Sequence, residues 1–149
     1  MERFKVSADV EVIASAAVDA AFSVHTELGP GLLESAYEDC LVHELRLRGM
    51  SFARQVSVPV NYKGMLIGTA FRADIVVEGK LLLEIKAIEQ LIGIHKAQVI
   101  TYLKLLKLPL GLVINFNESL IRDGLMRVLN VPKVKSRLSD RNFVPDIKS

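Results

Sequence analysis

The chain has 149 residues, 50% of them hydrophobic and 24% charged, which fits one folded domain and excludes intrinsic disorder. The net charge of +2 is low for a protein whose whole surface binds phosphate backbones, so a nucleic-acid contact needs a local patch or the basic tail at residues 133–149. No apolar run approaches the roughly 20 residues of a membrane helix, acidic residues interrupt the N-terminal apolar stretch, and the single cysteine forms no internal disulfide, so we expect a cytoplasmic protein.

Two helices are predicted at the start of the chain. Apolar residues recur at spacings of three and four over residues 9–28, the period of an amphipathic helix, and Gly29 follows the last of them. The same period over residues 30–48 predicts a second helix. Gly29 would serve as the N-cap of that helix, with Pro30 in its first turn.

The hydrophobic period then changes to two, which predicts strands. Residues 55–62 alternate, and Pro59 indicates that this strand lies at a sheet edge. A turn leads to a second alternating run at residues 67–77. After a tight turn at Gly79, residues 80–87 are almost wholly apolar, as expected of a central strand.

The last predicted elements are a helix and a short strand. The helix covers residues 91–107, and the buried strand covers residues 112–116. Residues 120–129 fit either a strand or a short helix. The element order is therefore ααβββαβ, in which three strands joined by hairpins lead through a crossover helix to a fourth.

Charged residues interrupt the apolar third strand. Period two places Glu84 and Lys86 on one face and Ile85 on the other. A hairpin that turns at Gly79 would bring Asp74 beside Glu84. Two neighbouring carboxylates repel unless a proton or a cation lies between them, and oxygen ligands favour Mg²⁺ or Mn²⁺. A purely structural cluster of ion pairs is the alternative interpretation.

The spacing Asp74-x9-Glu84-x-Lys86 resembles the signature of the PD-(D/E)xK nuclease superfamily, although Ala73 stands where that superfamily often has proline. The αβββαβ order of the superfamily also matches the elements predicted from the second helix onward. The resemblance implies an α/β, restriction-endonuclease-like fold with an extra N-terminal helix. The domain would cover residues 1–132. Because residues 133–149 show little periodicity, we expect them to form a mobile basic tail.

Two shorter motifs add to this resemblance, which spans about residues 9–130. Gly31-Leu-Leu-Glu34-Ser-Ala-Tyr37 resembles the motif that names the GxxExxY family, a small bacterial and archaeal branch of the superfamily. Gln98-x-x-x-Tyr102 resembles the helix motif of RecB-type nucleases, and residues four apart share a helix face.

The resemblance implies a metal-dependent nuclease that hydrolyses phosphodiester bonds of DNA or RNA. The implied catalytic residues are Asp74, Glu84, Lys86, Gln98, Tyr102 and Glu34. Asp74, Glu84 and the carbonyl of Ile85 would hold one or two ions of Mg²⁺ or Mn²⁺, with Glu34 as a further ligand through water. Lys86 would orient or deprotonate the attacking water, or stabilise the transition state.

Several of these residues also have simpler interpretations. Gln98 and Tyr102 would position Lys86 or contact the phosphate, or else form a polar pair on a half-exposed helix. Glu34 suits the first turn of a helix, where the macrodipole favours negative charge. One turn later, Glu38 is expected to be a solvated neighbour. His95 would be a hydrogen-bonded surface histidine or a base, and Tyr37 a site residue or a core residue.

Two other classes of function stay open. The near-neutral body favours a non-catalytic module that binds nucleic acid or protein. The second class is a homo-oligomeric scaffold that uses the apolar stretch at residues 103–108. Because the mean hydropathy of +0.32 is high for a monomer of this size, we expect a homodimer, formed through the helix at residues 91–107 or through a sheet edge.

Overall fold

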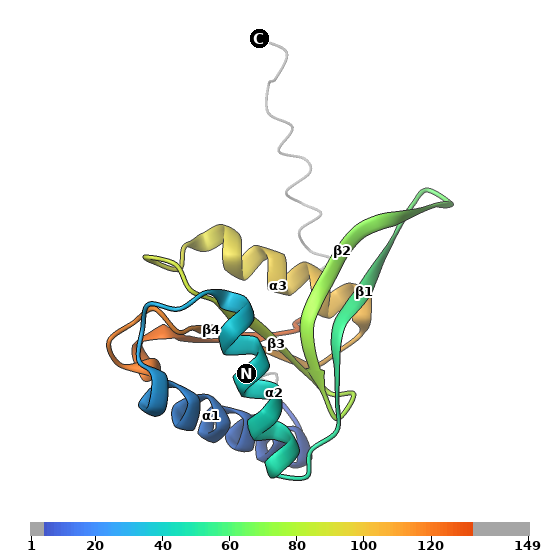
Figure 1. Cartoon of the computed structure of the whole chain (residues 1–149). Helices are drawn as coiled ribbons and strands as arrows, with labels where there is room; N and C mark the ends of the chain where they lie inside the picture. The colour runs from blue at the N-terminus through green and yellow to red at the C-terminus, as the bar shows by residue number, and fades with distance from the viewer. Residues whose placement is uncertain (1–4, 133–149) are drawn as a thin grey trace.

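The computed structural model describes residues 5–132, which form three α-helices and one five-stranded sheet (Figure 1). In chain order the elements are α1 (Ala8–Leu28), α2 (Glu34–Leu47), β1 (Phe52–Tyr62), β2 (Met65–Val77), β3 (Leu81–Lys86), α3 (Gly93–Leu106), β4 (Leu110–Asn115), the 3-10 helix η1 (Ile121–Gly124) and β5 (Leu125–Leu129). None of the helices in this range has the length and apolar character needed to cross a bilayer.

The strands lie in the order β1-β2-β3-β4-β5. Pairing is antiparallel except between β3 and β4, which run parallel, and α3 forms the crossover that a parallel pair requires. This arrangement confirms that β3 is central and that Pro59 marks an edge strand. Residues 120–129 contain both of the predicted alternatives, first η1 and then β5.

The sheet separates two apolar cores, with α1 and α2 on one face and α3 on the other (Figure 1). Alternate residues of β3 serve the two cores: Leu81, Leu83 and Ile85 pack under α1 and α2, whereas Leu82 packs under α3. Glu84 therefore lies on the α3 face of the sheet, as period two requires.

The second helix begins at Glu34, four residues later than predicted. Gly29, with a φ of 67°, ends α1 instead of starting α2, and its N–H donates to the carbonyl of His25. Gly31 has a φ of 109°, which is not helical. The Tyr37 hydroxyl donates to the Gly29 carbonyl at 2.5 Å, so a side chain from the first turn of α2 fixes the loop in a non-helical conformation despite the local signal at Pro30.

The apolar stretch at residues 103–108 is not a free surface, contrary to its predicted role in a scaffold. Leu103 and Leu108 are buried in the core under α3, and Leu105 and Leu106 are partly buried against it. The homodimer itself stays a prediction. The predicted tail at residues 133–149 lies outside the described part of the chain.

The β1–β2 hairpin is much longer than the rest of the sheet. β2 has 13 residues and β3 has six, and β3 pairs with β2 only at residues 75–77. The outer parts of β1 and β2 therefore pair only with each other, and they extend from the body as a two-stranded ribbon (Figure 1).

Candidate active site

Asp74 and Glu84 lie side by side at the point where β2 and β3 separate. Ile75 opposite Leu83 is the last regular pair of the ladder. Beyond it, the Asp74 N–H donates to Glu84 Oε2 at 2.7 Å, and the Ile85 N–H donates to Asp74 Oδ2 at 2.8 Å. Side-chain carboxylates thus replace the backbone ladder, and the predicted hairpin does bring the two acids together.

Burial strongly affects both carboxyl groups. Only 3% of the Glu84 surface is exposed. This burial, together with the negative charge of Asp74, raises the pKa of Glu84 to about 8. Burial also raises the pKa of Asp74, with a smaller contribution from the charge of Glu38. The positive charge of Lys86 opposes the rise in the pKa of both acids, although Lys86 forms no ion pair with either of them within residues 5–132.

The donor chemistry of this pair fits a hard cation, because each carboxylate keeps one oxygen that does not accept a backbone N–H of β2 or β3. Among residues 5–132, no three His, Cys, Asp or Glu side chains gather closely enough to hold a metal by themselves. Asp74 and Glu84 would therefore need a backbone carbonyl, such as that of Ile85, and water to complete a coordination shell.

Glu34 reaches the end of β3 from the first turn of α2. Its Oε2 accepts a hydrogen bond from the Ala87 N–H at 3.0 Å, one residue after Lys86. Ile88, the residue after Ala87, is held by Asn115 at the end of β4. The Asn115 side chain accepts from the Ile88 N–H and donates to the Ile88 carbonyl, both at 3.0 Å. The chain just after Lys86 is therefore fixed by the side chains of Glu34 and Asn115, of which only Glu34 was predicted as a site residue.

Gln98 and Tyr102 face the carboxylate pair from α3. The Gln98 side-chain amide donates to Tyr102 Oη at 3.1 Å. Burial raises the pKa of Tyr102, and the negative charges of Glu84 and Asp74 raise it further. The predicted polar pair is therefore present, and it lies within the electrostatic reach of the two acids.

Glu38 and Gln55 also belong to this cluster, although neither was predicted as a site residue. The prediction that Glu38 is solvated is wrong. Glu38 is buried, because it lies in the second turn of α2, which faces β1. It accepts hydrogen bonds from Arg54 Nε at 3.0 Å and from Gln55 Nε2 at 3.1 Å. The same Gln55 nitrogen lies 3.4 Å from Asp74 Oδ1, so Gln55 bridges two acids.

The backbone of Gln55 has a φ of +48°, a left-handed conformation that is unusual inside a strand. It lies between two residue pairs of regular register, Arg54 with Ile75 and Val56 with Ala73. The spacing of Glu34 and Glu38 by one helical turn was the available signal for their shared face. Gln55 stands in the polar phase of the alternating run at residues 55–62, so periodicity gave no signal for its role.

Two other residues have structural roles. His95 Nδ1 accepts a hydrogen bond from the Ile92 N–H at 2.8 Å, which caps the start of α3. Tyr37 is fully buried, and its ring stacks on Phe116 with centroids 4.5 Å apart. For Tyr37, the core interpretation with a hydroxyl on a backbone group is confirmed.

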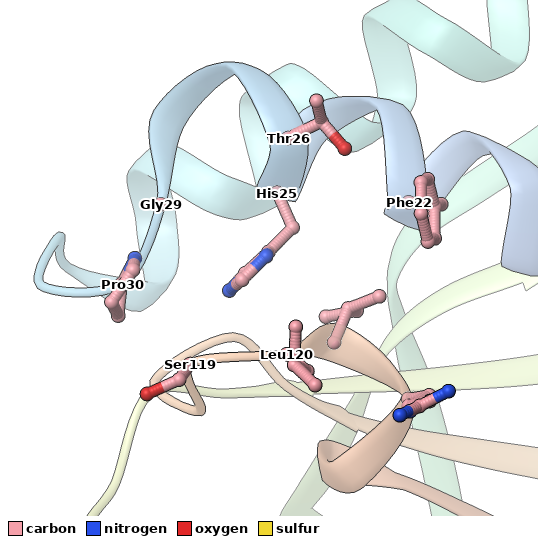
Figure 2. A pocket seen from close by; sticks show the side chains of 9 residues that line it. Phe22, His25, Thr26, Gly29, Pro30, Ser119 and Leu120 are labelled. Carbon is pink, nitrogen blue, oxygen red and sulfur yellow. The ribbon is translucent and has the colours of Figure 1, made fainter.

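A pocket of about 460 Å³ lies between the end of α1 and the loop after β4 (Figure 2). Phe22, Pro30 and Leu120 contribute apolar walls, and the imidazole of His25 points between them, with its Nε2 at 2.7 Å from the Glu118 carbonyl. The described residues that line this pocket include none of the predicted site residues. The candidate site is therefore the point where β2 and β3 separate, at Asp74 and Glu84.

Comparison with known proteins adds one finding. The sequence model of the PD-(D/E)XK nuclease superfamily matches residues 11–128, a range that includes every candidate site residue. Neither the curated proteins nor the solved structures that were compared match the chain. The predicted α/β fold class is confirmed, and membership of the GxxExxY branch stays a prediction. The chain belongs to the PD-(D/E)XK nuclease superfamily.

Proposed function

We propose that this protein is a nuclease that hydrolyses phosphodiester bonds with the help of Mg²⁺ or Mn²⁺. Membership of a nuclease superfamily supports a nucleic-acid substrate. The observation that carries the proposal is the Asp74–Glu84 pair, two adjacent and mostly buried carboxyls of which one has its pKa raised to about 8. Such a pair is stable at neutral pH only with a proton or a cation beside it.

Asp74 and Glu84 would hold the cation with the carbonyl of Ile85, and Glu34 would join them through water. Carboxylate and carbonyl oxygens are the ligands that Mg²⁺ and Mn²⁺ prefer. A divalent ion supplies this site with a more acidic water molecule and with positive charge that offsets the charge of the phosphate.

Lys86 is the residue to which we assign the chemical step. It follows Glu84 by two residues on the same strand face, and its positive charge opposes the rise in the pKa of both acids. From this position its ammonium would orient the attacking water or stabilise negative charge on the phosphate in the transition state, and its neutral amine would accept a proton from that water.

Tyr102 is assigned to phosphate binding. Because its oxygen accepts a hydrogen bond from Gln98, its own O–H is free to donate in another direction. The charges of Glu84 and Asp74 raise the pKa of Tyr102, so the two acids lie near its hydroxyl. A phosphate held by a cation at these acids would therefore lie near that hydroxyl as well. Gln98 thus orients Tyr102, and Gln55 orients Asp74.

A cleavage assay tests this proposal. The full chain is incubated with single- and double-stranded DNA and RNA, with Mg²⁺ or Mn²⁺, beside Asp74→Ala and the control Glu27→Ala, which removes an exposed acid of α1. We expect cleavage by wild type and Glu27→Ala and none by Asp74→Ala. Binding of nucleic acid without cleavage under either metal would contradict the proposal and favour the non-catalytic module.

A further inference from the structure

The ribbon formed by residues 58–71, here called the arm, carries apolar side chains that nothing in the described fold covers. Tyr62, Met65, Leu66, Ile67 and Phe71 are all more than a third exposed. Strand register places Tyr62 opposite Met65 on one face of the ribbon, whereas Leu66 points to the other. Apolar groups gathered on both faces of a protruding tip mark a contact with a partner.

The charge of this region indicates the sign of the partner's charge. Residues 55–73 and 90–117, which contain the arm and α3, have five basic residues and no acidic residue: Lys63, Arg72, Lys96, Lys104 and Lys107. The other described residues have fourteen acidic and eight basic side chains. Basic and acidic residues are thus separated along the chain, although the net charge is only +2. The region of the arm and α3 is therefore positively charged and attracts a polyanion.

The arm is also continuous with the candidate active site. The Phe71 ring at its base lies with its centroid 6.0 Å from that of Tyr102, and Asp74 follows three residues later. A partner held along the arm therefore reaches the carboxylate pair without leaving the surface. Edge-to-edge pairing with a second copy of the chain is disfavoured, because Pro59 interrupts the free edge of β1.

We propose that the arm enters a groove of duplex DNA and holds the duplex across Asp74 and Glu84. A two-stranded ribbon fits the major groove of B-form DNA, whereas the major groove of an RNA duplex is too narrow. Lys63 at the turn and Arg72 at the base contact phosphates, and Leu66 packs against the bases. This inference rests on the proposed nuclease function and names its substrate.

Binding measured by fluorescence anisotropy in EDTA, where no cleavage occurs, tests the arm. Leu66→Ser is compared with Leu47→Ser, because both leucines are 67% exposed and Leu47 lies at the end of α2, away from the arm. We expect Leu66→Ser to weaken binding of a 20-base-pair DNA about tenfold, the effect of losing one buried apolar side chain, and Leu47→Ser to leave it unchanged.

Lys63→Ala provides a second readout. It should lower the slope of log affinity against log salt concentration by about 0.9, the amount for one phosphate contact. Single-stranded DNA and duplex RNA should bind more weakly than duplex DNA. Equal affinity of Leu66→Ser and Leu47→Ser, or preference for either of the other nucleic acids, would overturn the proposal.

Two further outcomes are distinguishable. If light scattering shows that Leu66→Ser turns a dimer into a monomer while DNA affinity is unchanged, the arm binds a second copy and the inference is wrong. Cleavage by the wild type is measured separately. Cleavage with no effect of the arm variants would overturn the arm alone, and weakened binding by those variants without any cleavage would overturn the nuclease proposal alone.

Discussion

The two faces of the sheet differ in what they bury. Under α1 and α2 the core is apolar except where Glu38 of α2 is buried beside β1, and alanines such as Ala17, Ala20 and Ala21 let α1 approach closely. Under α3 an apolar core ends in Glu84, a carboxyl that burial holds at a pKa of about 8, beside Tyr102. Apolar packing stabilises a fold, whereas a buried acid lowers its stability. The first face therefore mainly supports the fold and contributes only Glu34 and Glu38 at its border with the site, whereas the second face carries Glu84.

The strongest test of this division concerns Lys86. Lys86→Ala should lower the cleavage rate by about a hundredfold or more, because a group that acts in the transition state is lost, and it should change affinity only slightly. Single-turnover cleavage and anisotropy measure the two effects. Lys80→Ala, at the turn of the same hairpin in an exposed pair with Asp9, is the control that should cleave normally. A wild-type rate in Lys86→Ala would remove Lys86 from the mechanism.

The buried acid should also make the metal-free protein less stable as pH rises. The pKa of Glu84 is about 8 in the folded state and near 4.5 in the unfolded state, so between these values the folded chain holds a proton that the unfolded chain has lost. The free energy of unfolding therefore falls from about pH 5 to pH 8, on the order of a few kcal/mol.

Glu84→Gln should remove most of this slope and be more stable than wild type at pH 8. Urea unfolding at several pH values in EDTA measures both quantities. Mn²⁺ at pH 8 should stabilise wild type and not Glu84→Gln, since an ion that binds only the folded state raises its stability. A wild type whose stability rises over this pH range would show that Glu84 is held as a structural ion pair.

The order of elements and the juxtaposition of Asp74 with Glu84 could be predicted, because both follow from periodicity and one tight turn. The burial of Glu38 could not, since it depends on how α2 rotates against β1. The left-handed Gln55 breaks the local rule for strands, and only its tertiary partners explain it. The helix expected to begin at Pro30 starts later because Gly31 has a positive φ, and the Tyr37 hydroxyl, eight residues after Gly29, bonds the Gly29 carbonyl.

Gln55 allows the site to be weakened without disturbing the core. Gln55→Gly removes the amide that bridges Glu38 and Asp74 and suits a φ of +48°. We expect the affinity for Mn²⁺, measured by calorimetry, to fall about tenfold, the effect of one charge-assisted hydrogen bond. Ser57→Gly in the same strand is the control, and it should lower stability by up to about 1 kcal/mol without affecting Mn²⁺. Equal Mn²⁺ binding by both variants would exclude a role of Gln55 in orienting Asp74.

The smallest predicted effect tests the other face. Tyr37→Phe keeps the ring that stacks on Phe116 but removes the hydroxyl that bonds the Gly29 carbonyl and the Leu32 N–H. Because the loop is partly exposed and water replaces part of what is lost, stability should fall by about 1 kcal/mol. Thermal unfolding measures this loss. Cleavage at a temperature where the variant is fully folded should match wild type if this face only supports the fold. A lower rate under that condition would mean that the loop positions Glu34 at the end of β3, and the division between the two faces would then fail at this loop.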